Sequence, residues 1–117
     1  MQLVCLTMEM TGTTGQDALG QVIATRVLIV DDQPGIHIVI SLGQPRKGDT
    51  EQGDYICPYQ INGVGLAKVK YAVGMDTLQA IQFAIDMIGA DVSAINRKLG
   101  GKLSWLEPGH KDLGLPQ

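Results

Sequence analysis

The stretch "GMDTLQAIQFAIDMIGADVSAINRKLGG", residues 74–101, decides the fold because its spacing of apolar residues predicts one long helix. Asp76 is a favoured N-cap residue, and Gln79 follows three positions later, as in a capping box. At the other end, two basic residues precede a Gly-Gly pair. Cations complement the negative end of the helix dipole there, and glycine supplies the left-handed cap. We expect the helix to run from residue 77 to residue 99.

One side of this helix is predicted to pack on a sheet. At about 100° per residue, seven branched apolar residues fall within one arc of about 100°, which is wide enough for a core stripe. The stripe consists of Leu78, Ile81, Ile85, Ile88, Val92, Ile95 and Leu99. A second arc is polar and is expected to face water.

The third arc of the helix is also apolar, although solvent would otherwise surround it. It contains the only Phe of the chain and four alanines, which let another surface approach closely. Full burial of a Phe or Met side chain contributes roughly 1.5–3 kcal/mol, so we expect something to cover this arc. The candidate partner interface consists of Ala80, Phe83, Ala84, Met87, Ala90 and Ala94.

Three alternatives remain for what covers this arc of the helix. They are a second copy of the chain, the apolar N-terminal decapeptide "MQLVCLTMEM" folded back on the helix, and a different protein. Homo-oligomers are common among soluble proteins, and a two-fold interface uses the same surface on both copies. A homodimer through the long helix is therefore the leading prediction.

Runs of β-branched and aromatic residues before the helix predict two hairpins. "VIATRVLIV" (residues 22–30) and "IHIVISL" (residues 36–42) flank "DDQPG", which has the composition of a turn. "DYICPYQI" (residues 54–61) and "LAKVKYAV" (residues 66–73) flank Asn62-Gly63. Asn-Gly between strand patterns is a strong hairpin signal, since both residues tolerate positive φ. The extra Val and Gly that follow indicate a longer loop or a bulge.

With a closing strand at "KLSWL" (residues 102–106), the order becomes β-β-β-β-α-β. Hairpins imply an antiparallel sheet, and one long helix is expected to pack across one of its faces. The prediction is an α+β fold with four to five strands. Residues 1–21 are interpreted as a flexible segment or an added strand, and residues 22–117 as a single α+β domain.

Alternation predicts which side chains of the second hairpin face the core. The first strand is expected to present on one face Tyr55, Cys57, Tyr59 and Ile61. Its partner is expected to present on its apolar face Ala67, Val69, Tyr71 and Val73, with Lys68 and Lys70 in water. Pro58 cannot donate to a strand ladder, so it predicts an edge strand or a bulge.

Composition excludes several functional classes. The chain has 117 residues and a net charge of −3, without the basic patch of a nucleic-acid-binding protein. No apolar run is long enough to span a bilayer, and the N-terminus lacks the basic region of a signal peptide. Cys5 and Cys57 are too few for a disulfide framework or a four-ligand zinc site, although the two could pair. A reducing cytoplasm is the simpler interpretation.

Motifs that carry chemistry are absent from the sequence. We find no phosphate-binding glycine loop, no nucleophile elbow and no metal-ligand spacing, so we predict no catalytic residue, metal or cofactor. The candidate ligand pocket consists of Tyr55, Cys57, Tyr59 and Trp105. The alternative interpretation is an aromatic-rimmed core in which the cysteine is a small buried hydrophobe, and we favour it.

Several motifs together resemble a family of small bacterial proteins of unknown function. They are "ATRVL", "YICPYQINGVG", "GMDTLQAIQFAI", and "LSWL" followed by "DLGLP". Members of this family are similar to the chain in three features: a Tyr/Trp-x-Cys-x-Tyr/Phe-x-Ile-x-Gly strand, a Gly-x-Asp-x-x-Gln-Ala helix start and a Leu-x-Trp strand before a Gly-rich end. The resemblance covers residues 22–116. It supports the predicted fold and implies no known activity, substrate or cofactor.

The functional hypotheses follow from these patterns. The leading one is a non-enzymatic, cytoplasmic bacterial accessory or interaction domain that is homodimeric through the long helix. A second is a small-ligand-binding domain or a minor enzyme that uses the candidate pocket. A third is a toxin-neutralising, immunity-type protein, which the small size and acidity permit. A closed sheet–helix interface favours the first, and a cavity with converging polar groups favours the second.

Overall fold

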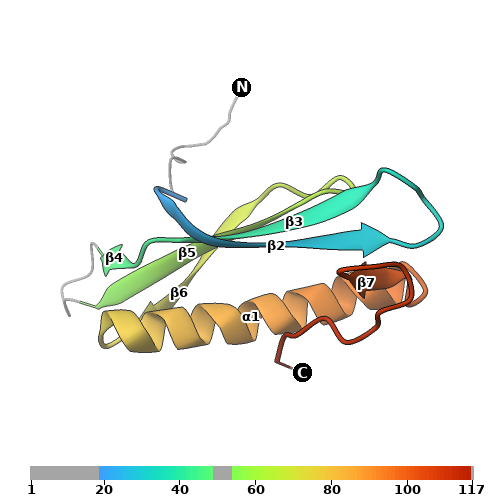
Figure 1. Ribbon diagram of the computed structural model, residues 1–117. Helices are drawn as coiled ribbons and strands as arrows, with labels where there is room; N and C mark the ends of the chain where they lie inside the picture. The colour runs from blue at the N-terminus through green and yellow to red at the C-terminus, as the bar shows by residue number, and fades with distance from the viewer. Residues whose placement is uncertain (1–18, 49–53, 117) are drawn as a thin grey trace.

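The computed structural model describes residues 19–48 and 54–116, so the expectations for residues 1–18 lie outside the described part. The elements in chain order are β2 (Val22–Val30), β3 (His37–Gly43), β4 (Arg46–Lys47), β5 (Tyr55–Asn62), β6 (Val69–Gly74), α1 (Thr77–Lys98) and β7 (Leu103–Trp105). The sheet forms one layer, and α1 packs on one of its faces (Figure 1). The predicted α+β class is confirmed.

All strand pairs are antiparallel. β2 pairs with β3 on one edge and with β7 on the other, β3 pairs with β5, and β5 pairs with β6. The strand order is therefore β6-β5-β3-β2-β7, and β4 continues along the same edge of β5 as β3. Both predicted hairpins and the closing strand are confirmed. The two-residue β4 is an addition to the predicted set.

Pro58 lies beside a bulge in the interior of the sheet. β5 has neighbours on both edges, so the edge-strand alternative is wrong. Between the pairs Leu42↔Tyr59 and Arg46↔Ile56, the β3–β4 side contains three residues and the β5 side contains two. Such a mismatch defines a bulge, and it falls where proline cannot donate to the ladder.

The turn of the second hairpin lies two residues later than Asn62-Gly63. Gly63 and Leu66 exchange two backbone hydrogen bonds, of 3.0 and 2.9 Å. Val64 and Gly65 between them have φ values of 43° and 84°, the positive φ that a two-residue type I′ turn requires. A β-branched residue is strained in this conformation, so Val64 carries a local cost.

The predicted core face of β6 is reversed. Ala72 and Gly74 are buried under α1, whereas Tyr71 and Val73 are 56% and 43% exposed on the outer face. The helix begins three residues after β6 and lies directly on it. A Cβ atom at Gly74 would come 2.4 Å from the backbone nitrogen of Ala80, so only small residues fit beneath the helix.

The helix has the predicted caps. Asp76 Oδ1 accepts a 2.7 Å hydrogen bond from the Gln79 backbone, and Gln79 Oε1 accepts one of 2.8 Å from Met75. This is a capping box one position displaced from the standard reciprocal bond. By length and composition α1 could cross a membrane, a property that core helices of globular domains share. Here α1 runs along β5 and β6 (Figure 1).

The buried face of α1 is rotated from the predicted stripe. Ile88 and Val92 are buried as expected, but Leu78 is 65% exposed. Ala80 and Ala84, assigned above to a partner interface, have no exposed surface and belong to the core. The assignment of these two alanines is therefore wrong. The physical reason is the close approach of α1 to β6, which places the smallest side chains of the helix in the contact.

The chain after β7 is a strap, defined here as residues 106–116. Leu113 and Leu115 pack against the hydrophobic core. The strap then crosses α1 at Gly89, where a Cβ atom would come 2.2 Å from the carbonyl oxygen of Pro116. α1 continues through this glycine to Lys98, and the missing side chain leaves room for the strap.

Candidate functional site

The exposed flank of α1 lies beside β6. Phe83 and Met87 are 43% and 37% exposed, although they lie next to the buried face of the helix. Asp91 follows Met87 by four residues on the same side of the helix and forms an ion pair with Lys70 of β6. The Phe83–Met87 flank is therefore the side of α1 that faces the β6 end of the sheet. Ala90 is also exposed and Ala94 is half-buried.

The outer edge of β6 is open. Within residues 19–48 and 54–116, every residue of β6 pairs with β5 on one edge, and no strand pairs with the other. Two backbone hydrogen bonds, from Val30 N to Ile36 O and from Asp31 N to Lys102 O, show which neighbouring strand each residue of β2 faces with its N–H and C=O groups. Successive residues of a strand face opposite neighbours, so the same assignment can be followed from strand to strand. Carried through the ladder registers, this alternation leaves the backbone groups of Val69, Tyr71 and Val73 pointing outward.

We call this region the β6 margin: Phe83 and Met87 on α1, with Val69, Tyr71 and Val73 on β6. Its side chains are apolar on both faces of the sheet, and no described strand pairs its backbone edge. Edge strands of native proteins are normally short, charged or covered, because an open edge can pair with another chain. The margin therefore has the composition of a contact surface.

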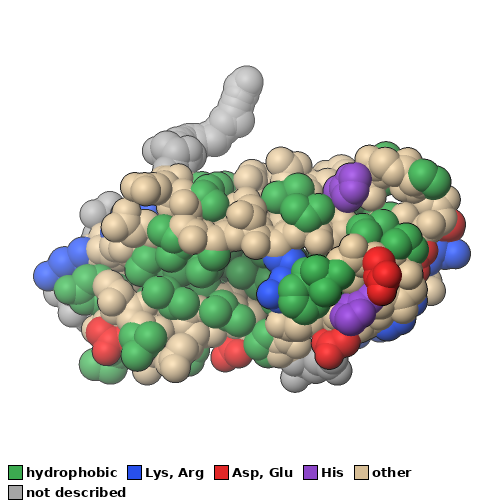
Figure 2. Space-filling view, in the orientation of Figure 1, with side chains coloured by type: hydrophobic (Ala, Val, Ile, Leu, Met, Phe, Trp, Pro, Cys, Tyr) green, Lys and Arg blue, Asp and Glu red, His purple; other side chains and the backbone are tan. Residues whose placement is uncertain are grey.

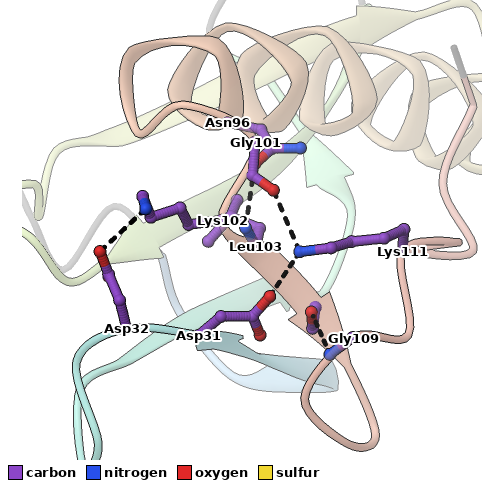
Figure 3. Close-up of polar contacts among 9 residues, drawn as sticks. Asp31, Asp32, Asn96, Gly101, Lys102, Leu103, Gly109 and Lys111 are labelled. Carbon is purple, nitrogen blue, oxygen red and sulfur yellow. Dashed lines mark hydrogen bonds and ion pairs between the residues drawn. The ribbon is translucent and has the colours of Figure 1, made fainter.

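The opposite edge, at β7, is closed by polar contacts (Figure 3). The outward N–H of Leu103 donates to Asn96 Oδ1 at 3.0 Å, and that of Trp105 donates to the His110 carbonyl at 2.9 Å. Lys111 pairs with Asp31 and donates to the Gly101 carbonyl at 3.0 Å. The hydrogen bond from Lys111, assisted by one from Ser104, holds the pKa of the Asp31 carboxyl below its usual value.

Arg26 anchors the strap to this closed edge. Its guanidinium lies 3.9 Å from the centre of the Trp105 ring, a cation–π geometry. The same group donates to the carbonyl oxygens of Leu113 and Gly114 at 3.1 and 2.9 Å. Sequence reasoning missed this network, because the partners are separated by up to 88 residues.

The four candidate pocket residues do not come together. Tyr55, Cys57 and Tyr59 lie on β5, whereas Trp105 lies on β7, with β3 and β2 between them. Three strand spacings correspond to about 14 Å. Cys57 has no exposed surface, its thiol lies 3.5 Å from the Gly43 carbonyl, and burial raises its pKa. This environment is that of a structural cysteine.

Tyr59 instead belongs to a small polar cluster. Its hydroxyl donates to Asp91 Oδ2 at 2.7 Å, and Lys70 Nζ lies 3.1 Å from the same oxygen. Burial, and then the hydrogen bond to the Asp91 carboxylate, raise the pKa of Tyr59. Asp91 is one of the two charged residues that interrupt the apolar arc of the helix, and that interruption was the available sequence signal.

Two open hollows of about 220 Å³ flank α1. One lies at the Tyr59 cluster and is lined by Tyr59, Ile61, Leu66, Lys68, Lys70, Asp91, Ala94 and Ile95. The other lies between α1 and β2, where Figure 2 shows hydrophobic side chains gathered, and Leu115 of the strap lines part of it. In the described part of the chain, no three His, Cys, Asp or Glu side chains converge to hold a metal ion.

The fold and the margin define a small α+β domain whose described sheet has one closed edge and one open edge. Residues 24–117 match the family model "Domain of unknown function (DUF6968)", and the chain belongs to that family. The resemblance to an uncharacterised domain family is thereby confirmed. No curated protein and no solved structure matches the chain.

Proposed function

We propose that this domain is a non-enzymatic interaction module that forms a homodimer through the Phe83–Met87 flank of α1. The observation that carries the proposal is the exposure of these two side chains beside an open sheet edge. A two-fold interface places the same flank of both copies in contact, so the apolar side chains of one copy meet those of the other. The free Cys57 thiol suits a reducing compartment, and we place the module in the bacterial cytoplasm.

The flank alone gives a weak dimer. Burying the exposed part of Phe83 and Met87 on both copies contributes roughly 2–5 kcal/mol at the usual value for apolar side chains. Association costs at least about 4 kcal/mol in lost translational and rotational freedom. A dimer that is populated at micromolar concentration therefore requires more contact than the helix flank supplies.

The test is the oligomeric state of two matched variants. Phe83→Lys places a charge in the proposed contact, and we expect a monomer by size-exclusion chromatography with light scattering. Leu78→Lys places the same charge on the other flank of α1, where the side chain is already 65% exposed, and should leave the dimer intact. A wild-type chain that is monomeric at high micromolar concentration would falsify the proposal.

A second candidate function is the binding of a small ligand in the hollow at Tyr59. The observation that favours it is a largely apolar cavity with an ordered Tyr59–Asp91–Lys70 cluster and a further cation at Lys68. Lys68 and Lys70 outnumber the single carboxylate, so a short apolar chain with a carboxylate group fits this hollow. Titration with hexanoate should shift the amide NMR signals of residues 91–95. Unchanged signals in the wild-type chain, or equal shifts in Lys68→Ala, would exclude this candidate.

A further inference from the structure

We infer that the two copies join along their β6 edges, so that both sheets become one continuous antiparallel sheet with the two α1 helices side by side on it. This inference rests on the proposed homodimer and names its second contact. The helix flank is too small by itself, and the outer edge of β6 is the adjacent surface whose outward backbone groups no described strand pairs.

Helix contact and edge pairing are geometrically compatible. Neighbouring strands lie about 4.8 Å apart, so a two-fold axis between paired β6 strands lies about 2.4 Å beyond each strand. α1 lies over β5 and β6. A helix axis above the midline of these strands is therefore about 5 Å from the two-fold axis, and the two helices are about 10 Å apart. Packed helices have interaxial distances of roughly 8–10 Å, so edge pairing brings the Phe83–Met87 flanks into contact without rearrangement.

The outward backbone groups select one register. Because Val69, Tyr71 and Val73 point outward, hydrogen-bonded pairs must form among these residues of the two copies. A register centred on Tyr71 pairs Tyr71 with Tyr71 of the partner subunit, and Val69 with Val73 of the partner subunit. All three outward residues of each strand are then used. Centring the register on Ala72 leaves Val69 without a partner inside β6.

The side chains are self-complementary in this register. On the outer face it forms an aromatic pair at the two-fold axis, flanked by two valine pairs, and such cross-strand pairs stabilise sheets. On the helix face, Lys70 lies opposite Ala72 of the partner subunit, so the only charged residue of β6 does not meet its own copy. Lys70 is also neutralised by Asp91 within its own chain.

Amide hydrogen exchange of the full chain tests the inference. At a concentration where light scattering shows the dimer, the amides of Val69, Tyr71 and Val73 should exchange at least ten-fold more slowly than in dilute, monomeric protein. The amides of Lys70 and Ala72, which point to β5, serve as internal controls and should change much less. Leu78→Lys should retain the concentration-dependent protection, and Phe83→Lys should lose it.

The outcomes separate this inference from the proposed function. If the dimer forms but the three outward amides exchange equally fast at both concentrations, the edge pairing is wrong and the helix-mediated dimer stands. If no dimer forms at any concentration, both are wrong. Protection that is present in the monomer and disappears on deletion of residues 1–10 would assign the edge to the chain's own N-terminal segment, which also overturns the inference.

A variant of the backbone provides a second test. Val73→Pro removes one outward N–H group that no described strand pairs, and proline is tolerated at such edge positions. We expect the dissociation constant to rise at least ten-fold, with Val73→Thr as the control that keeps the N–H. An unchanged dissociation constant for the folded Val73→Pro variant would contradict edge pairing, even where Phe83→Lys still gives a monomer.

Discussion

The two edges of this sheet differ in whether their outward backbone groups have partners within the described chain. β7 has three residues, and both of its outward N–H groups donate to acceptors of the same chain, Asn96 and His110. β6 has six residues, with outward backbone groups that no described strand pairs and apolar side chains around them. An exposed edge invites association. Within the described sheet only the β6 edge is open, so the proposed association through it would stop at two copies.

The difference also shows in the chemistry of the two edges. The β7 edge gathers ion pairs, a cation–π contact and hydrogen bonds to backbone carbonyls. None of the five residues of the β6 margin is charged, and the neighbouring Lys70 forms an ion pair with Asp91. Polar contacts between residues that are far apart in the sequence close the β7 edge and hold it in a single geometry. The apolar side chains of the other edge retain surface for a partner.

The largest expected effect comes from breaking the closed edge. Leu103 in β7 has no exposed surface, so Leu103→Ala should lower the free energy of unfolding by about 2–5 kcal/mol, through lost burial and a cavity. Leu106→Ala, three residues later and 69% exposed, is the control, with an expected change within about 0.5 kcal/mol. Urea unfolding with a fluorescence readout measures both. Equal effects of the two variants would show that β7 is not part of the cooperative core.

A smaller effect is expected where the strap crosses the helix. In an unobstructed helix Gly→Ala gains about 1 kcal/mol. At Gly89 the new methyl group would meet the Pro116 carbonyl, so Gly89→Ala should instead destabilise the protein by about 1–3 kcal/mol. Thermal unfolding measures the sign. Stabilisation would mean that the strap does not hold its position on α1.

The third prediction concerns Tyr59, close to the open edge. The folded state raises the pKa of Tyr59, so it binds the phenolic proton more tightly than the unfolded chain, whose pKa is about 10. Stability from this group is complete below that value and falls as the pH rises above it. Tyr59→Phe should lower the free energy of unfolding by about 1 kcal/mol at neutral pH, through the lost hydrogen bond to Asp91. It should also reduce the loss of stability at alkaline pH, which we call the alkaline limb of the stability curve. Unfolding curves from pH 8 to pH 11 check both effects, and an unchanged alkaline limb would contradict the assignment.

The smallest expected effect is at the turn that leads into β6. Val64 adopts φ of 43°, a conformation that asparagine tolerates better than a β-branched residue. Val64→Asn should raise the free energy of unfolding by about 0.5–1 kcal/mol and leave the dissociation constant of the dimer unchanged, since the turn lies outside the β6 margin. Chemical denaturation against Leu66→Asn, outside the strained position, provides the comparison. A destabilised Val64→Asn would show that the valine contributes packing that exceeds its strain.

Local patterns predicted the elements of this fold well. The caps at Asp76 and Gln79, the hairpin of β2 and β3 and the inward face of β5 all depend on residues close in sequence. The inward faces of β6 and α1 were mispredicted, because hydrophobicity favoured valine and leucine over alanine and glycine. The small space between α1 and β6 decided which residues of these two elements are buried. That space depends on where α1 sits, and no periodicity within either element encodes it.

The site was less predictable than the fold. Phe83 and Met87 were identified from the excess of apolar residues on α1, and both are exposed. The grouping of Trp105 with the β5 residues required the strand order, which the element order alone does not determine. Arg26 and Lys111 gave no sequence signal, since their partners are carbonyl groups and a carboxylate at large sequence separation.

The connection between Arg26 and the strap has a consequence for synthesis on the ribosome. Gly114 is made 88 residues after Arg26, which at about 5–20 residues per second is a delay of roughly 4–18 seconds. For most of that interval, until residues 103–105 have been made, one edge of β2 lacks β7, its partner in the described sheet, and β2 is the longest strand there. A nascent chain therefore carries a long strand with one edge still waiting for β7, and crowded polysomes would be the place where it first aggregates.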